Sequence, residues 1–174
     1  MTSLKDSKNR TKEQALAIYL NWLTKGETQD SIADKFGIKD RIFVSHVCES
    51  VPIALVKDFV PKHLGSNFLN REDWLLKNTL LVKSLYDLND DQFCIIGDGT
   101  YCYCEKSTNN SVQKLCFSVQ KSRHLVKPFV ICTANGFIID VYGPFQATAN
   151  DASILKHILE TNEDLKNLIK VRSI

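Results

Sequence analysis

Two apolar runs, KPFVICT and FIIDVYG, flank the short segment ANG at residues 127–143, and they leave few folds open to this part of the chain. Branched side chains such as valine and isoleucine favour strands because they pack well on a pleated surface. An Asn-Gly pair between two such runs indicates a tight hairpin turn. We therefore expect two antiparallel strands that are neighbours in one sheet.

The spacing of the apolar residues divides the chain into three zones. Residues 10–51 have the period of three helices, of which the third is expected to end at Pro52. Residues 52–92 are predicted to be a helical connector, in which one long helix begins after Asn70. From residue 93 the period becomes that of strands, and the helical segments NDASILKHILE and NEDLKNLIKV follow the hairpin. The chain is thus expected to be a mixed α+β protein with an all-helical N-terminal module.

The first zone has the pattern of a helix-turn-helix. Its first two helices have capping residues at Thr11 and Thr28, and Gly37 suits the positive φ of a tight turn. The third helix is then the candidate for reading DNA, with Lys39, Arg41, Ser45 and His46 as contact residues. The alternative is a three-helix packing module without a ligand. Eight basic against seven acidic residues in positions 1–51 give little general attraction for phosphate.

Composition sets loose limits on function. The 174 residues are 44% hydrophobic and 24% charged, with a formal net charge of +2, which fits an ordinary globular protein. The sequence contains no apolar run of about 18 residues and no apolar signal core, so we expect an intracellular protein with reduced cysteines and no membrane contact. A zinc site from Cys102, Cys104, Cys116 and His124 has irregular spacing, and free thiols are the simpler interpretation.

Charge is segregated within the third zone. Residues 84–105 contain five acids and no lysine or arginine, whereas residues 106–139 contain five bases and no acid. Carboxylates bind divalent metals, and basic side chains bind phosphate, so the two segments together suit a metal-dependent site for nucleic acid. A solvated basic face is the simpler alternative.

Asp98 and Asp151 are the two acids that need an explanation. Asp98 interrupts the strand-like run FCIIGDGTYCYCE, although a charge is costly inside a strand unless something pairs with it. Asp151 stands at the start of a predicted helix. Taken singly, Asp98 could be a turn residue and Asp151 a helix cap.

Three separated segments resemble the DDE superfamily endonucleases, the catalytic domains of Harbinger-like cut-and-paste DNA transposases and their domesticated relatives. These segments are IIGDGTYCYCEKS, SVQKSRHLVKPFVICTANGFIIDVYGPF and NDASIL, and they occur in the order of the family within residues 85–160. The resemblance implies an RNase H-like α/β domain that holds Mg²⁺ or Mn²⁺ between catalytic carboxylates. It implies that Asp98 and Asp151 are catalytic metal ligands and that Lys121, Arg123 and Lys127 contact DNA phosphate.

The family pattern also needs a third carboxylate well downstream of the second. Only 23 residues follow Asp151, and the acids Glu160, Glu163 and Asp164 stand too close to it to be assigned. We therefore expect an incomplete RNase H-like domain over residues 93–174 and an inactive nuclease. The resemblance further implies DNA as partner, a nuclear location and action as a homo-oligomer. The alternatives are a non-catalytic, sequence-specific DNA-binding protein and a protein-interaction domain.

Overall fold

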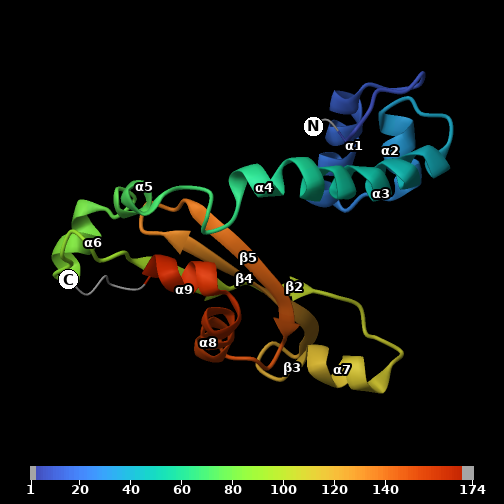
Figure 1. The fold of residues 1–174 in the computed structure, drawn as a ribbon. Helices are drawn as coiled ribbons and strands as arrows, with labels where there is room; N and C mark the ends of the chain where they lie inside the picture. The colour runs from blue at the N-terminus through green and yellow to red at the C-terminus, as the bar shows by residue number, and fades with distance from the viewer. Residues whose placement is uncertain (1–2, 170–174) are drawn as a thin grey trace. The chain divides into compact units, whose positions relative to one another are not determined.

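The computed structural model describes residues 3–169. The chain forms two compact units, Met1–His63 and Leu64–Ile174, and each is described by itself. The first unit is helical in its described part, and the second combines helices with an antiparallel sheet (Figure 1). No helix in the described part of the chain is long and apolar enough to cross a membrane.

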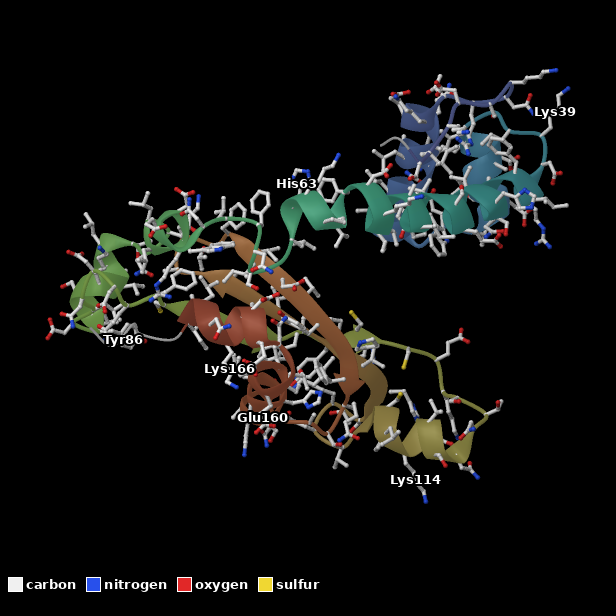
Figure 2. All side chains as sticks on the ribbon, in the orientation of Figure 1. Lys39, His63, Tyr86, Lys114, Glu160 and Lys166 are labelled. Atoms are coloured by element: carbon white, nitrogen blue, oxygen red, sulfur yellow. The ribbon has the colours of Figure 1, made fainter. Side chains whose placement is uncertain are left out.

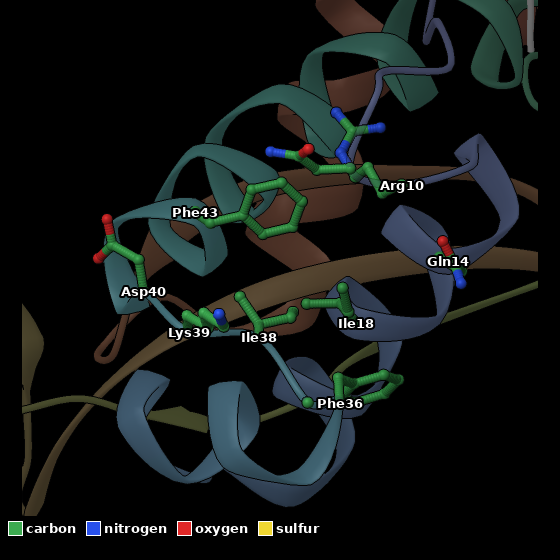
Figure 3. A pocket seen from close by; sticks show the side chains of 10 residues that line it. Arg10, Gln14, Ile18, Phe36, Ile38, Lys39, Asp40 and Phe43 are labelled. Carbon is green, nitrogen blue, oxygen red and sulfur yellow. The ribbon is translucent and has the colours of Figure 1, made fainter.

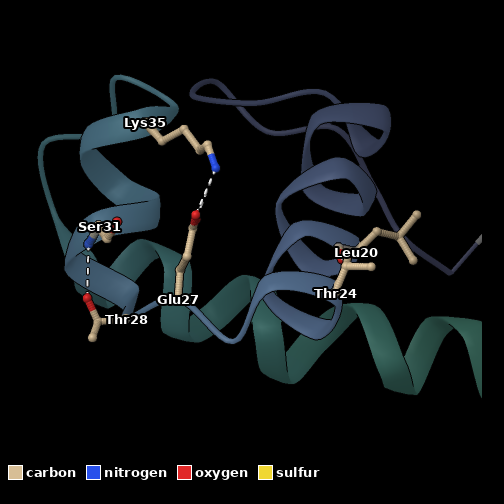
Figure 4. A network of polar contacts seen from close by, with 6 residues as sticks. All are labelled: Leu20, Thr24, Glu27, Thr28, Ser31 and Lys35. Carbon is tan, nitrogen blue, oxygen red and sulfur yellow. Dashed lines mark hydrogen bonds and ion pairs between the residues drawn. The ribbon is translucent and has the colours of Figure 1, made fainter.

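Three helices and a short fourth make up the first unit: α1 (Lys12–Lys25), α2 (Gln29–Lys35), α3 (Arg41–Asp58) and α4 (Val60–His63). Local capping fixes where the first two begin. Thr11 and Gln14 form a capping box at α1, which satisfies two backbone donors reciprocally. The hydroxyl of Thr28 accepts a hydrogen bond from the backbone N–H of Ser31 at α2, beside an ion pair of 3.0 Å between Glu27 and Lys35 (Figure 4).

The helices of the first unit share one apolar core. Gly37 has a φ of +65° between α2 and α3, as the turn pattern predicts. This turn lets Ile32 on α2 and Val44 on α3 pack into the same cluster as Ile18 on α1. The core therefore comes from three helices whose positions are fixed by short connections.

The predicted end of α3 at Pro52 is wrong. The helix runs through Pro52 to Asp58, so the predicted division at residue 51 falls within a helix. Proline removes one backbone hydrogen bond from a helix, which is a real cost. The buried side chains of Val51 and Ala54, on either side of Pro52, pack into the core and keep this part of the helix in place.

The helix predicted after Asn70 is two short helices. Asn70 caps α5 (Arg71–Leu75), and Thr79 caps a separate α6 (Leu80–Leu85). The indole of Trp74 is fully buried, and its Nε1 donates a hydrogen bond of 2.9 Å to the carbonyl of Ser66. Trp74 therefore anchors α5 in the core of the second unit.

The sheet of the second unit is built around one long strand. β4 (Arg123–Thr133) and β5 (Ile138–Gln146) are the predicted hairpin, and Gly136 in its turn has a φ of +84°. The other strands are β1 (Ile95–Gly99), β2 (Cys102–Tyr103) and β3 (Phe117–Ser118), and all pair with β4 antiparallel. Since Phe129 pairs with Gly99 on one side and Tyr142 on the other, β1 and β2 lie along one edge of β4 and β5 along the opposite edge.

The run LCFSVQ, residues 115–120, lies in the zone where the sequence pattern predicts strands, but most of it is not a strand. Leu115 and Cys116 belong to α7 (Asn110–Cys116), and only Phe117 and Ser118 are strand. The side chain of Asn109 accepts hydrogen bonds from the backbone N–H groups of Ser111 and Val112, and this cap starts a helix before the apolar run begins.

Helices cover one face of the sheet. α8 (Asp151–Thr161), which Asn150 caps, and α9 (Glu163–Ile169) lie together against the β4–β5 hairpin (Figure 1). Ile154 and Ile158 of α8 form a core with Phe129 and Ile131 of β4. This face is called the helix-covered face below, and the opposite face, which carries Ile96 at 47% exposure, is called the open face.

Candidate functional site

Asp98 lies in the middle of β1, directly opposite Val130 on β4. Its carboxylate is exposed and has no hydrogen-bond or ion-pair partner among residues 3–169. An unpaired charge in the middle of a strand contributes nothing to the folding of that strand. The stability of the strand therefore does not require a carboxylate at this position.

The two glycines that flank Asp98 show which face its side chain occupies. A Cβ atom on Gly97 would meet the ring of Phe129 at 2.9 Å, and one on Gly99 would meet Oδ1 of Asp151 at 2.7 Å. Both glycines thus face α8 and the helix-covered face. Because successive residues of a strand point to opposite faces, Asp98 points to the open face.

Asp151 occupies the first position of α8, where it forms an ion pair with Lys127. The Nζ of Lys127 donates hydrogen bonds to Oδ1 of Asp151 at 2.7 Å and to the carbonyl of Ala149 at 2.9 Å. The lysine side chain is only 5% exposed, whereas that of Asp151 is 44% exposed. The ammonium also lies 5.6 Å from the ring centroid of Tyr101, so its surroundings consist of a carboxylate, a carbonyl and a π face.

The structure does not bring Asp98 and Asp151 to one metal site. Asp98 is on the open face, and Asp151 is bound to Lys127 on the helix-covered face. Across the described part of the chain, no group of three His, Cys, Asp or Glu side chains is placed to hold a metal ion. The described residues therefore contain no metal centre with three such ligands.

The acids downstream of Asp151 have partners in or near their own helices. Glu160 lies 3.8 Å from Lys156 and Glu163 lies 2.9 Å from Lys166, each measured between oxygen and ammonium nitrogen. Asp164 accepts a hydrogen bond of 2.7 Å from Asn67. These contacts lie within α8, within α9 and between α9 and the segment ahead of α5, and they do not reach Asp98.

Lys121 and Arg123 are exposed, and each basic group lies over a tyrosine ring. The Nζ of Lys121 is 5.3 Å from the centroid of Tyr101, and the guanidinium carbon of Arg123 is 5.4 Å from that of Tyr103. The sequence pattern did not lead us to predict a role for the two tyrosines. They alternate with Cys102 and Cys104 in the run TYCYCE. This alternation indicates that both rings lie on the same face of a strand, and it could have identified the pair from the sequence.

A cavity of about 440 Å³ connects this basic region with Asp151. Tyr101 and Lys127 line it from the sheet, and Asn150 and Asp151 line it from the start of α8. Residues 118–120, at the end of β3 and just after it, close another side. The cavity therefore places an aromatic ring, a carboxylate and the first turn of a helix in one hollow.

The predicted DNA contacts of the first unit lie around the start of α3. Lys39, Arg41 and His46 are exposed, and Ser45 is half-buried. Lys39 lies at the outer surface of its unit, as Lys114 does in the second (Figure 2). A guanidinium nitrogen of Arg41 is 3.9 Å from a carboxylate oxygen of Asp30, a long and exposed ion pair that a phosphate could replace.

A second cavity, of about 400 Å³, opens beside the start of α3 (Figure 3). Arg10, Lys39 and Asp40 provide its charged lining, and Ile18 and Phe43 provide apolar walls. The guanidinium of Arg10 lies 6.0 Å from the ring centroid of Phe43. Basic side chains therefore gather at the end of α3 that the sequence predicts for DNA contact.

Cys104 and His124 are neighbours across the β2–β4 edge, where the backbone N–H of Cys104 donates to the carbonyl of His124 at 3.0 Å. Desolvation and the adjacent thiol of Cys116 raise the pKa of Cys104 above its ordinary value. All six cysteines are free. The described part of the chain thus contains a thiol pair here and no cluster able to hold zinc.

Comparison with known proteins gives one result for the second unit. Residues 97–168 match the family model of the DDE superfamily endonuclease, a stretch that contains Asp98, Lys127 and Asp151 and covers less than half of the chain. Neither a curated protein nor a solved structure matches. The resemblance seen in the sequence is confirmed to this extent: residues 97–168 are similar to the DDE superfamily endonuclease domain.

Proposed function

We propose that the second unit belongs to a transposase-derived endonuclease that cleaves DNA with the help of Mg²⁺ or Mn²⁺. The observation that carries this proposal is Asp98, an unpartnered carboxylate in the middle of β1, within the stretch that matches the superfamily. Carboxylate oxygens are the ligands that these ions prefer. DNA as substrate would place the protein in the nucleus, with two copies acting on two DNA ends.

Asp98 would hold the ion, and further ligands must join it at the open face before the site is complete. The bound ion would stabilise negative charge on the phosphodiester. Asp151 has a different role in this proposal. Its Oδ1 neutralises the buried ammonium of Lys127 and is therefore already used by a cation.

Metal binding tests the proposal without requiring turnover. Substoichiometric Mn²⁺ should broaden the backbone amide signals of Asp98 and Val130 in a nitrogen-proton correlation spectrum of the full chain. Asp98→Asn should abolish this broadening, whereas Glu160→Gln, which changes an exposed carboxylate on α8, should leave it intact. Equal broadening in wild type and Asp98→Asn would remove Asp98 from the metal site.

Cleavage is tested in parallel on supercoiled plasmid with Mg²⁺ or Mn²⁺. Since the described residues bring a single carboxylate to the open face, we expect little or no nicking by this chain. Any metal-dependent nicking that persists in Asp98→Asn would exclude Asp98 from the mechanism.

A second candidate function is sequence-specific DNA binding by the first unit through a helix-turn-helix. The exposed side chains of Lys39, Arg41 and His46 at one end of α3 favour it. The triple substitution to alanine should weaken duplex binding by the full chain and lower its salt dependence. Lys25→Ala, at the end of α1, is the matched control. Unchanged binding by the triple variant would contradict a reading role for α3.

A further inference from the structure

We infer that Tyr101, Tyr103, Lys121 and Arg123 form a binding strip for unpaired nucleotides of DNA. The two tyrosines stand one residue apart at β2, so their side chains project from the same face about 7 Å apart. Tyr101 is 37% exposed and Tyr103 is 57% exposed. Two large rings in a row on one edge of the sheet are more than a core of this size needs, and both remain accessible.

Each ring is matched by a basic group. Lys121 lies over Tyr101 at 5.3 Å and Arg123 lies over Tyr103 at 5.4 Å, measured to the ring centroids. Both basic side chains are exposed and neither makes an ion pair with a described residue. They are therefore free to move from the ring to a phosphate when a nucleotide stacks there.

Lys127 fixes the inner end of the strip. Its ammonium lies 5.6 Å from the ring centroid of Tyr101 and donates hydrogen bonds to Oδ1 of Asp151 and to the carbonyl of Ala149. This arrangement keeps Tyr101 at the wall of the cavity that contains Asp151. The strip thus leads from an exposed edge of the sheet to the hollow at the start of α8.

The charge around the strip selects a polyanion. Lys121 and Arg123 belong to residues 106–139, which contain five basic residues and no aspartate or glutamate, whereas Tyr101 and Tyr103 belong to residues 84–105, which contain five acids. The attraction for a polyanion therefore comes from the basic side chains that lie over the rings. Repeated phosphates would contact the basic groups, and planar rings would stack on the tyrosines. Single-stranded nucleic acid offers both features at a regular spacing, because every base has a π face and every nucleotide carries a phosphate.

Unpaired nucleotides fit this strip better than a duplex does. The bases of a duplex already stack on one another, so a tyrosine ring can reach a base face only where the pairs are open. An acidic peptide would supply charge without the rings. The strip therefore fits the unpaired strand of an opened DNA end. It lies on the helix-covered face, since Tyr103 pairs with the buried Leu125, and so on the opposite face from Asp98. The choice of DNA rests on the proposed function.

The test is binding of a fluorescent 20-nucleotide oligo(dT) to the full chain, followed by anisotropy. Tyr101→Leu with Tyr103→Leu keeps apolar bulk and should weaken binding by about tenfold or more, since stacking contributes a large part of the affinity for each base. The paired phenylalanine substitutions should bind as the wild type does. Tyr86→Leu is the control, because Tyr86 is a tyrosine directly after α6 that is 65% exposed and lies outside the strip, and it should have no effect.

The contribution of Lys121 and Arg123 is measured separately, by the salt dependence of oligo(dT) binding. Lys121→Ala with Arg123→Ala should lower the slope of log affinity against log salt by about 1.4, because each lost contact with a single strand accounts for about 0.7. Lys156→Ala, an exposed lysine on α8, should leave the slope unchanged.

Two results would overturn the strip. One is unchanged affinity for oligo(dT) in the double leucine variant, and the other is an equal loss for a 20-base-pair duplex, which has no free base faces. Asp98→Asn separates this inference from the proposed function, since it should lose the Mn²⁺ response and keep oligo(dT) binding. Tight oligo(dT) binding without any Mn²⁺ response would support the strip and contradict the nuclease.

Discussion

The ammonium of Lys127 lies 2.7 Å from Oδ1 of Asp151, and this ion pair joins the middle of β4 to the first turn of α8. The family resemblance implies that Lys127, in the basic segment 106–139, contacts DNA phosphate. The structure instead places its side chain among Tyr101, Ala149 and Asp151, almost out of solvent. The pair lies directly beneath Gly99, the residue after Asp98.

Removing the carboxylate of Asp151 should lower the free energy of unfolding more than removing the ammonium of Lys127. Asp151→Ala leaves the ammonium of Lys127 buried without a counter-charge, and we expect it to lower the free energy of unfolding by about 3 kcal/mol. Lys127→Met should cost less, because Asp151 is half exposed and water can solvate it. Urea unfolding of both single variants and of the double variant gives the coupling between them. Equal losses in the two single variants would contradict this asymmetry.

Gly99→Ala should destabilise the second unit by about 1–3 kcal/mol, as overpacked sites do. The added methyl group would lie 2.7 Å from Oδ1 of Asp151 and 2.8 Å from Cε of Lys127, so the ion pair must shift, and its Lys127 side is only 5% exposed. Thermal or urea unfolding measures the loss. Thr100→Ala, at the exposed next position, is the control and should change stability little.

Asp98→Asn should abolish metal binding without changing the free energy of unfolding. The carboxylate has no partner among the described residues, so its replacement should change the free energy of unfolding by no more than about 0.5 kcal/mol, the range of ordinary surface substitutions. The same variant should lose the Mn²⁺ response described above. A loss of several kcal/mol, measured by urea unfolding, would mean that Asp98 is a structural residue.

Alkylation of Cys104 should depend on Cys116. The pKa of Cys104 is raised by desolvation and by the neighbouring thiol, so at a given pH less thiolate is present and iodoacetamide reacts more slowly. Cys116→Ala removes the neighbouring thiol and should shift the pH profile of Cys104 alkylation to lower pH. Peptide mapping by mass spectrometry follows this one site among the six cysteines. An unchanged profile would show that Cys116 does not influence Cys104.

The features that the sequence predicted well depend on near neighbours. The β4–β5 hairpin follows from two branched runs around an Asn-Gly pair, and the caps at Thr11 and Thr28 follow from side chains that bind backbone within three residues. Such interactions are complete within a short stretch of chain, so they can be predicted from it.

The features that the sequence did not reveal depend on contacts between distant segments. Pro52 lies within a helix because the buried neighbours Val51 and Ala54 hold that helix in the core. Lys127 is buried because Asp151, on another element, faces it. Likewise, the face on which each carboxylate lies depends on the register of β1 against β4, which one sequence alone does not fix.

The alternation along β1 restricts how this sequence can change in length. A single deletion before Asp98 that left the pairing with β4 in place would turn the carboxylate toward Asp151 and Lys127 and turn Gly99 outward. Insertions and deletions should therefore be excluded from Ile95–Gly99. They should be tolerated between Ser107 and Asn109, in the exposed loop ahead of α7, where no ladder hydrogen bond would be shifted.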